Sequence, residues 1–250
     1  MILGILLCDD VREPLQADHG NYPEMFTQLF EQVDTRLQLR FYRVIDGQYP
    51  ESLDECDGYL IGGSRFSVYD NTRWIVTLTA FVQRLSQQHI PLVGICFGHQ
   101  MLAWALGGDV TRSDNGWGIG VHQATFNAHE ALQHSWLPEA LEKYALVVSH
   151  QDQVLTLPPH ATILAGSPFC PNAMMLVGDY CLGIQGHPEF TTHYSQDLIT
   201  LRHALYPEKT ANNALNSLLA HTHHLDIAQV IISFVKSRLL MARGTASFHP

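Results

Sequence analysis

The sequence is poor in charge, above all in positive charge. Charged residues make up 15% of its 250 positions, and 14 Lys and Arg stand against 24 Asp and Glu, which gives a formal net charge of −10. Nucleic-acid binding relies on clustered Lys and Arg that neutralise phosphates, and no such cluster occurs here. The composition therefore argues against a nucleic-acid partner and favours a small polar substrate or a protein partner.

The sequence also lacks long apolar runs and paired cysteines. No run approaches the roughly 18 to 20 residues that cross a bilayer, and the apolar start Met1–Cys8 has neither the basic residues nor the cleavage site of a signal peptide. The five cysteines show no metal-ligand spacing, and an odd number favours free thiols over a disulfide framework. We expect a cytoplasmic protein without membrane contact.

Linkers, internal repeats and low-complexity tracts are missing as well. The length and the 46% hydrophobic content suit one sizeable buried core. We predict a single domain over residues 1–250, with a catalytic core over about 1–190 and a C-terminal helical extension over about 191–250. The last residues, Thr245–Pro250, are expected to be frayed.

Short apolar runs alternate with helical patterns along the chain. The runs lack strict polar alternation, which is typical of strands covered on both faces; they occupy Ile2–Cys8, Leu39–Ile45, Tyr59–Ile61, Pro91–Ile95, Ala145–Val148 and Cys181–Ile184. Helical patterns cover Tyr22–Val33, Thr72–Gln88, His99–Leu106, Thr192–Leu205 and Leu225–Leu239, the last closed by Arg243-Gly244. This order predicts a doubly wound α/β fold, with a mostly parallel central sheet, helices on both faces and additional C-terminal helices.

One junction between a strand and a helix carries a candidate nucleophile. The run Pro91–Ile95 leads into Gly-Ile-Cys-Phe-Gly, and a helical pattern follows. Flanking glycines permit a sharp strand-to-helix turn, and the start of a helix favours a thiolate over a thiol. A buried, inert cysteine is the ordinary alternative, but the combination of strand, glycines and helix start favours Cys96 as a nucleophile.

A proton carrier follows another apolar strand. His187 lies just beyond Cys181–Ile184, and strand ends of this kind gather at one edge of a doubly wound sheet. Glu189 lies two positions later, on the same side of an extended segment, where it can orient one imidazole nitrogen. We therefore predict a catalytic triad of Cys96, His187 and Glu189.

A glycine pair offers donors for a developing negative charge. Gly62 and Gly63 follow the strand Tyr59–Ile61, and backbone N–H groups at glycine are not shielded by a Cβ. Such a pair is often a simple turn, but here it precedes the nucleophile strand by one helix. We predict that an N–H group of this glycine pair and the N–H group of Phe97 form an oxyanion hole.

Three motifs together resemble the class I, triad-type glutamine amidotransferase family: Gly-Ile-Cys-Phe-Gly-His-Gln at 94–100, Gly-His-Pro-Glu-Phe at 186–190 and Gly-Gly-Ser at 62–64. Residues 64–70 and Trp74 are similar to stand-alone members related to the glutaminase domain of GMP synthase. The resemblance implies a flavodoxin-like fold. It also implies that Cys96 attacks the side-chain carboxamide of glutamine and that water later releases glutamate from a γ-glutamyl thioester.

The resemblance implies further substrate contacts. Gln100 matches the glutamine of the family's elbow, which helps to hold the substrate. Residues 148–152 are similar to a later loop whose backbone meets the α-carboxylate and amino groups of the substrate, which points to Ser149, His150 and Gln151. Gly62 is expected to contact the substrate beside the oxyanion hole.

The chain departs from the large synthetases of this family after Glu189. No Gly-rich phosphate loop follows, and the remaining residues have helical patterns. The first interpretation is a glutaminase that passes ammonia to a separate synthetase partner, and the second is a self-sufficient hydrolase of γ-glutamyl compounds, similar to γ-glutamyl peptidases. Both begin with the same thioester, so the sequence leaves both open. A non-catalytic or redox-sensing binding protein is disfavoured because the His and Glu are both present.

Histidines near the C-terminus offer the one metal-like pattern. His221, His223 and His224 lie together, but no Cys or carboxylate is spaced with them, and an amphipathic helix follows. A solvated helix start is the favoured interpretation. We expect neither a metal nor a cofactor.

Overall fold

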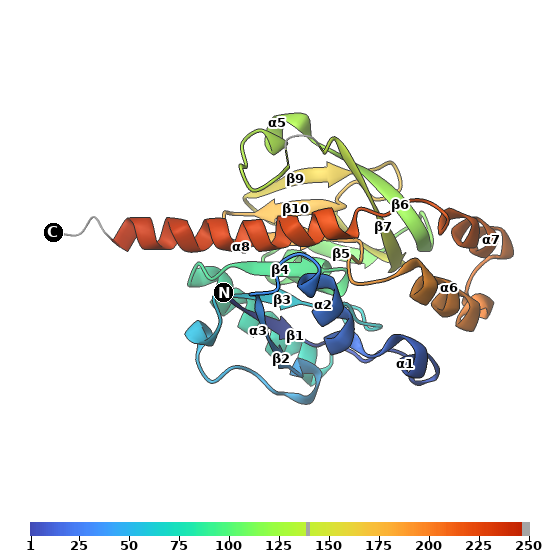
Figure 1. The fold of residues 1–250 in the computed structure, drawn as a ribbon, viewed down its shortest axis with the longest axis horizontal. Helices are drawn as coiled ribbons and strands as arrows, with labels where there is room; N and C mark the ends of the chain where they lie inside the picture. Colours follow the sequence, from blue (N-terminus) through green and yellow to red (C-terminus); the bar gives the residue numbers. More distant parts are fainter. Residues whose placement is uncertain (139–140, 247–250) are drawn as a thin grey trace.

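The computed structural model describes residues 1–138 and 141–246. These residues form a nine-stranded mixed sheet in the order β2-β1-β3-β4-β11-β10-β9-β6-β7, and a separate two-stranded sheet of β5 and β8. The strands of the parallel half are β1 (Ile2–Leu6), β2 (Gln38–Tyr42), β3 (Gly58–Ile61), β4 (Leu92–Ile95) and β11 (Cys181–Ile184). Figure 1 shows the sheet and the helices that surround it.

Helices cover both faces of the parallel half. In β1, Leu3 and Ile5 pack into one core, while Leu6 on the opposite face packs into the other. The first core also receives α2 (Tyr22–Glu31) and α8 (His224–Ala246), and the second receives α3 (Arg73–Gln87) and α4 (Phe97–Ala105). Strands β1, β3, β4 and β11 therefore bury apolar side chains on both sides, which confirms the predicted doubly wound α/β fold.

The other half of the sheet is antiparallel. It consists of β10 (Met174–Val177), β9 (Ala161–Gly166), β6 (Gly118–Phe126) and β7 (Lys143–His150). The small second sheet pairs β5 (Asp109–Arg112) with β8 (Asp152–Thr156). Of these strands only β7 was predicted, so the sheet is mixed to a greater extent than the sequence indicated. Short helix α5 (Ala128–Ala131) lies between β6 and β7.

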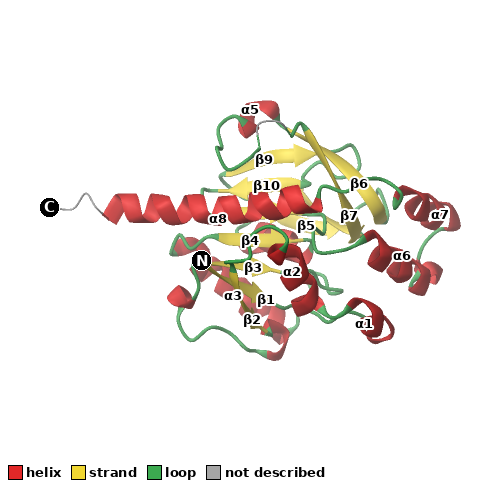
Figure 2. Cartoon of the chain, in the orientation of Figure 1, coloured by secondary structure: helices red, strands yellow, loops and turns green. Residues whose placement is uncertain are grey.

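The region after β11 is helical, as expected. α6 (Thr192–Leu201) and α7 (Glu208–Ser217) pack against β6 around a small cluster that includes Ile199 and Ala211, and α1 (Glu13–His19) contacts α6. Helix α8 lies across the sheet (Figures 1 and 2), and its buried residues join the first core.

Two details of this region differ from the prediction. The helix Thr192–Leu205 ends at Leu201, and a short 3-10 turn follows at His203–Leu205. Helix α8 runs through Gly244 to Ala246 and does not end at Arg243-Gly244, and residues 247–250 of the predicted frayed end lie outside the described residues. No helix in the described ranges is long and apolar enough to cross a membrane.

Candidate active site

Cys96 occupies a strained turn between β4 and α4. Its backbone has φ 52° and ψ −101°, a left-handed φ that non-glycine residues avoid and that costs on the order of 1–3 kcal/mol. Glycines on both sides permit the turn: a Cβ at Gly94 would overlap the Gly98 carbonyl, and one at Gly98 would overlap the Ile61 carbonyl. The geometry is that of a nucleophile elbow, because it lifts the thiol out of the strand at the start of a helix.

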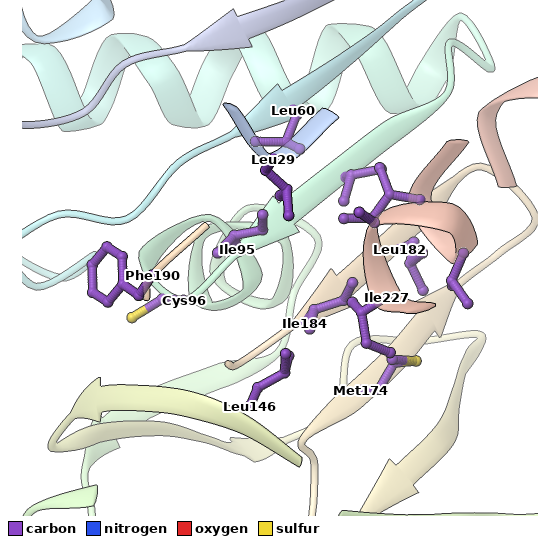
Figure 3. Close-up of a cluster of buried hydrophobic side chains, with 14 of the residues drawn as sticks. Leu29, Leu60, Ile95, Cys96, Leu146, Met174, Leu182, Ile184, Phe190 and Ile227 are labelled. Carbon is purple, nitrogen blue, oxygen red and sulfur yellow. The ribbon is translucent and has the colours of Figure 1, made fainter. Parts of the chain in front are cut away.

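His187 and Glu189 lie beside this turn, just after β11. The His187 N–H donates to the Val147 carbonyl at 2.8 Å, which fixes the segment against β7. The His187 Nδ1 atom lies 2.8 Å from Glu189 Oε1, and the two side chains are 4% and 0% exposed. Phe190 stacks on the imidazole with ring centroids 3.9 Å apart and an interplanar angle of 4°. Figure 3 shows Phe190 beside Cys96 at the edge of the first core.

These contacts decide the charge of the imidazole. Burial alone would lower the pKa of His187, but the negative charges of Glu189 and Cys96, and hydrogen bonds to both, raise it well above its ordinary value. A protonated His187 is therefore favoured at neutral pH. Burial raises the pKa of each of the other thiols, namely Cys8, Cys56, Cys170 and Cys181.

The predicted oxyanion donors are free. In the part of the chain that the structure describes, neither the Gly63 N–H nor the Phe97 N–H has a hydrogen-bond acceptor, whereas the Gly62 N–H donates to the Leu6 carbonyl at 3.1 Å. A Cβ at Gly63 would lie 2.8 Å from His187 Cε1. Gly63 therefore lies directly against the His187 imidazole, and any contact of Gly62 with a substrate has to use an atom other than its N–H.

Two clefts meet at Cys96. The first has a volume of about 160 Å³ and is lined by Ser64, Arg65, Phe66, Ser67, Cys96, Gln100, Arg112, Trp117, Ser149, His150, Gln151, Asp152 and Arg202. The second has a volume of about 50 Å³ and is lined by Asp9, Asp10, Arg12, Tyr22, Ser64, Arg65, Cys96, Ser149, His187, Phe190, Tyr194, Leu198 and Arg202. Cys96 thus borders two adjoining clefts, which also share Ser64, Arg65, Ser149 and Arg202.

The first cleft brings together Gln100, Ser149, His150 and Gln151, four of the five residues predicted to hold the substrate, whereas Gly62 lines neither cleft. Gln100 is 4% exposed, and its Nε2 atom donates to the Asp152 carbonyl at 2.9 Å and to Gln185 Oε1 at 3.2 Å. Burial lowers the pKa of His150 to about 3, so its ring is neutral and its Nδ1–H donates to the Asp152 carbonyl at 3.0 Å. Gln100 and His150 therefore fix the backbone of the loop, and Ser149 lies at the boundary between the two clefts.

Comparison with known proteins decides the family. Residues 19–203 match the family described as "Glutamine amidotransferase class-I". The chain belongs to the class I glutamine amidotransferase family. It is 32% identical to Gamma-glutamyl peptidase 3 of Arabidopsis thaliana over 86% of this chain and 88% of that protein. It is 30% identical to a putative glutamine amidotransferase of Saccharomyces cerevisiae over 78% of this chain and 80% of that protein.

Two further similarities extend this comparison. The glutamine-hydrolysing GMP synthase of Aeropyrum pernix is 32% identical over 60% of this chain, which corresponds to 27% of that protein. The crystal structure of a glutamine amidotransferase from Thermotoga maritima superposes with a TM-score of 0.70 at 20% identity, and covers 96% of this chain and 97% of that one. The latter similarity supports the glutamine amidotransferase fold, and the relatives indicate a hydrolase-type enzyme.

Several residues around this amidotransferase site were not predicted. Arg12, Arg65, Arg112 and Arg202 line the clefts, and they come from four distant parts of the chain. No motif in the sequence connects them. Basic residues are scarce in this sequence, and Arg65 directly follows the Gly-Gly-Ser motif. These two facts together are the one signal that could have drawn attention to the arginines.

One group in the described residues has the composition of a metal site. Ligand atoms of His19, His193 and Asp197 lie within 4.8 Å of one another, and His19 Nε2 is paired with Asp197 Oδ2 at 2.8 Å. The pair joins the end of α1 to α6, beside the second cleft. The C-terminal histidines have other contacts: His223 Nδ1 accepts from the Ala145 N–H at 3.1 Å, and His224, the first residue of α8, bonds Thr222 at 2.9 Å.

Proposed function

We propose that this amidotransferase-family chain hydrolyses γ-glutamyl amide bonds through a thioester on Cys96. The observation that carries the proposal is a strained Cys96 beside a buried His187–Glu189 pair, with two free N–H donors next to it. Each group corresponds to one step of an acyl transfer.

The first half of the reaction forms the thioester. The Cys96 thiolate attacks the γ-carbonyl carbon, and the Gly63 and Phe97 N–H groups donate to the resulting oxyanion. When the intermediate collapses, the carbon–nitrogen bond breaks and the leaving nitrogen takes a proton from the His187 imidazolium. Glu189 holds the ring throughout and does not itself transfer a proton.

The second half releases glutamate. The now neutral His187 takes a proton from water, whose oxygen attacks the thioester carbonyl in the same oxyanion site. Collapse of this intermediate expels the thiolate and leaves an imidazolium, which restores the starting ion pair. The enzyme needs no redox group for either half.

The two clefts favour a γ-glutamyl compound with a substantial leaving group. One cleft accommodates the γ-glutamyl part, and the adjoining cleft gives space beside Cys96 and His187 for the amine. Similarity to Gamma-glutamyl peptidase 3 over most of both chains favours the same substrate class. We therefore place self-sufficient γ-glutamyl hydrolysis ahead of ammonia delivery.

The second candidate is a glutaminase that supplies ammonia to a separate synthetase. Similarity to part of GMP synthase favours it, and this chain continues after Glu189 with helices α6 to α8. In that case the second cleft is the ammonia exit, and a cytoplasmic protein partner covers it.

A panel of amide substrates tests the proposal. Glutamate release from glutamine and from γ-glutamyl dipeptides is measured with the wild-type chain and with Cys96→Ser. We expect the wild type to cleave the dipeptides with the higher kcat/KM and Cys96→Ser to cleave neither, because the thioester requires the thiolate. Retained activity of Cys96→Ser overturns the mechanism, and a preference for glutamine favours the second candidate.

A further inference from the structure

Positive charge is concentrated around Cys96 in a chain that has little of it. Four of its 14 basic residues line the two clefts, although the chain carries a formal net charge of −10. These residues are Arg12, Arg65, Arg112 and Arg202. Such a local excess attracts and positions anionic ligands.

The acidic residues of the second cleft already have partners. Asp9 is paired with Arg65 at 2.6 Å, and Asp10 is paired with Arg43 at 2.8 Å. The hydrogen bonds and charge of Arg43 lower the pKa of Asp10 to about 2, so this carboxylate stays ionised and paired. These two acids are therefore matched by cations other than Arg12 and Arg202.

Arg12 and Arg202 are the cations that remain. In residues 1–138 and 141–246, neither forms an ion pair with a carboxylate. Both line the second cleft, and Arg202 lines the first cleft as well. The second cleft therefore has positive charge without a matching anion from the chain.

Arg202 is fixed in place by aromatic rings. Its guanidinium carbon lies 5.1 Å from the centre of the Trp117 ring and 5.7 Å from that of Tyr206. Its Nη1 atom lies 3.5 Å from Ser149 Oγ, and its Nε atom is buried without a hydrogen-bond partner among the described residues. A buried charged donor without an acceptor is unfavourable, so a ligand that supplies an acceptor gains from binding there.

The first cleft, which Arg202 also lines, offers other charged partners for a γ-glutamyl group. Asp152 provides a carboxylate for the α-ammonium group, and Arg112 provides a guanidinium for the α-carboxylate. Ammonia, the leaving group of glutamine, has no negative charge that could use Arg12. Arg12, which lines only the second cleft, and Arg202, which lines both, are thus explained by a different leaving group.

We propose that Arg12 and Arg202 bind a carboxylate on the leaving amine, so that the preferred substrates are γ-glutamyl amino acids or peptides. This inference rests on the proposed function, because it assigns a residue pair to the leaving side of the same reaction. The pair positions the substrate and takes no part in bond making.

Two substrates that differ in one carboxylate test the inference. γ-Glutamylglycine and γ-glutamylethylamide share the γ-glutamyl group and a two-carbon amine, but only the first has a leaving-group carboxylate. We expect the kcat/KM of the wild type to be about tenfold or more higher for γ-glutamylglycine than for γ-glutamylethylamide. Ion pairs between the leaving-group carboxylate and the two arginines, well placed but partly hydrated, account for a preference of this size.

Variants at the two arginines test whether these residues cause the preference for γ-glutamylglycine. Arg12→Met and Arg202→Met keep most of the side-chain stem, and each should lower the ratio of the two kcat/KM values by about tenfold, mainly through KM for γ-glutamylglycine. Arg12→Lys keeps the charge and should retain most of the preference. Arg36→Met is the matched control, because the Arg36 side chain is 90% exposed and lines neither cleft.

The outcomes separate the inference from the proposed function. If the wild type cleaves neither substrate, the proposed function is wrong. If it cleaves both equally well, or if Arg12→Met and Arg202→Met leave the ratio unchanged, only the carboxylate site is wrong. If Arg202→Met does not fold, Arg12→Met and Arg12→Lys decide the question alone.

Discussion

Replacing Glu189 by glutamine tests the electrostatic core of the proposed mechanism. The Glu189 side chain is fully buried, and its Oε1 atom lies 2.8 Å from His187 Nδ1. Oε2 has no hydrogen-bond partner among the described residues, so an amide group can take the place of the carboxylate without breaking another hydrogen bond. Glu189→Gln therefore removes one negative charge while it keeps an acceptor for the imidazole N–H.

The size of the effect follows from the distance. At an effective dielectric constant of about 20, two unit charges 2.8 Å apart interact by about 6 kcal/mol, part of which is offset by burial of the pair. Carboxylates beside a cation typically shift a pKa by about 1–3 units, and one unit corresponds to about 1.4 kcal/mol. We expect Glu189→Gln to lower the raised pKa of His187 by about two units.

The assay is the pH dependence of kcat/KM for a γ-glutamyl dipeptide. Activity needs the His187 imidazolium, so it is lost as the pH rises through the pKa of this group. In Glu189→Gln this loss should occur at a pH lower by about two units. Glu130→Gln is the control, because Glu130 pairs with His129 at 3.1 Å on α5 and lines neither cleft. An alkaline limb that stays in place refutes the role given to Glu189.

Two further substitutions test the site and the core. Gly63→Ala places a Cβ 2.8 Å from His187 Cε1, so the imidazole ring must move. We expect kcat to fall on the order of 10²-fold while the circular dichroism spectrum stays native. An unchanged kcat would show that the ring tolerates the methyl group. Ile231→Ala in α8 removes a fully buried side chain and should lower the free energy of unfolding by about 2–5 kcal/mol in denaturant titrations. Leu240→Ala on the same helix is the control, because Leu240 is 70% exposed; equal losses in both would contradict the packing of α8 against the sheet.

The strands and the turn that were predicted correctly are those whose formation has a local physical cause in the sequence. Strands β1, β3, β4 and β11 are buried on both faces, and this produces the continuous apolar runs from which they were predicted. The elbow at Cys96 has a local cause as well, since it needs two glycines within a few residues. The positive φ of Cys96 confirms that the turn is strained in the way the motif indicates.

The antiparallel half of the sheet has no comparable local signal. Strand β6 contains Gly118 and Gly120, a partly buried His122 and two exposed polar residues, and its neighbour β9 has few buried side chains. These strands form because long-range pairing with β7 and β10 satisfies their backbone groups. A pattern of side chains along one strand does not contain this information.

The composition of the two clefts is also a long-range property. Arg12 follows β1, Arg202 follows α6, and they come together because the carboxyl ends of the parallel strands meet beside α1 and α6. The stacking of Phe190 on His187 was missed for a different reason. The motif identifies the residue, but the orientation of its ring depends on Tyr22 and Tyr194, which pack around it.

Trapping of the acyl-enzyme tests the central proposal most directly. The wild-type chain is mixed with a γ-glutamyl dipeptide, quenched in acid within a single turnover and digested, and the peptides are examined by mass spectrometry. The proposed mechanism predicts one γ-glutamyl group on the peptide that contains Cys96, absent from Cys96→Ser and lost on longer incubation. Steady turnover without any adduct at Cys96, or an adduct on a different residue, would contradict it.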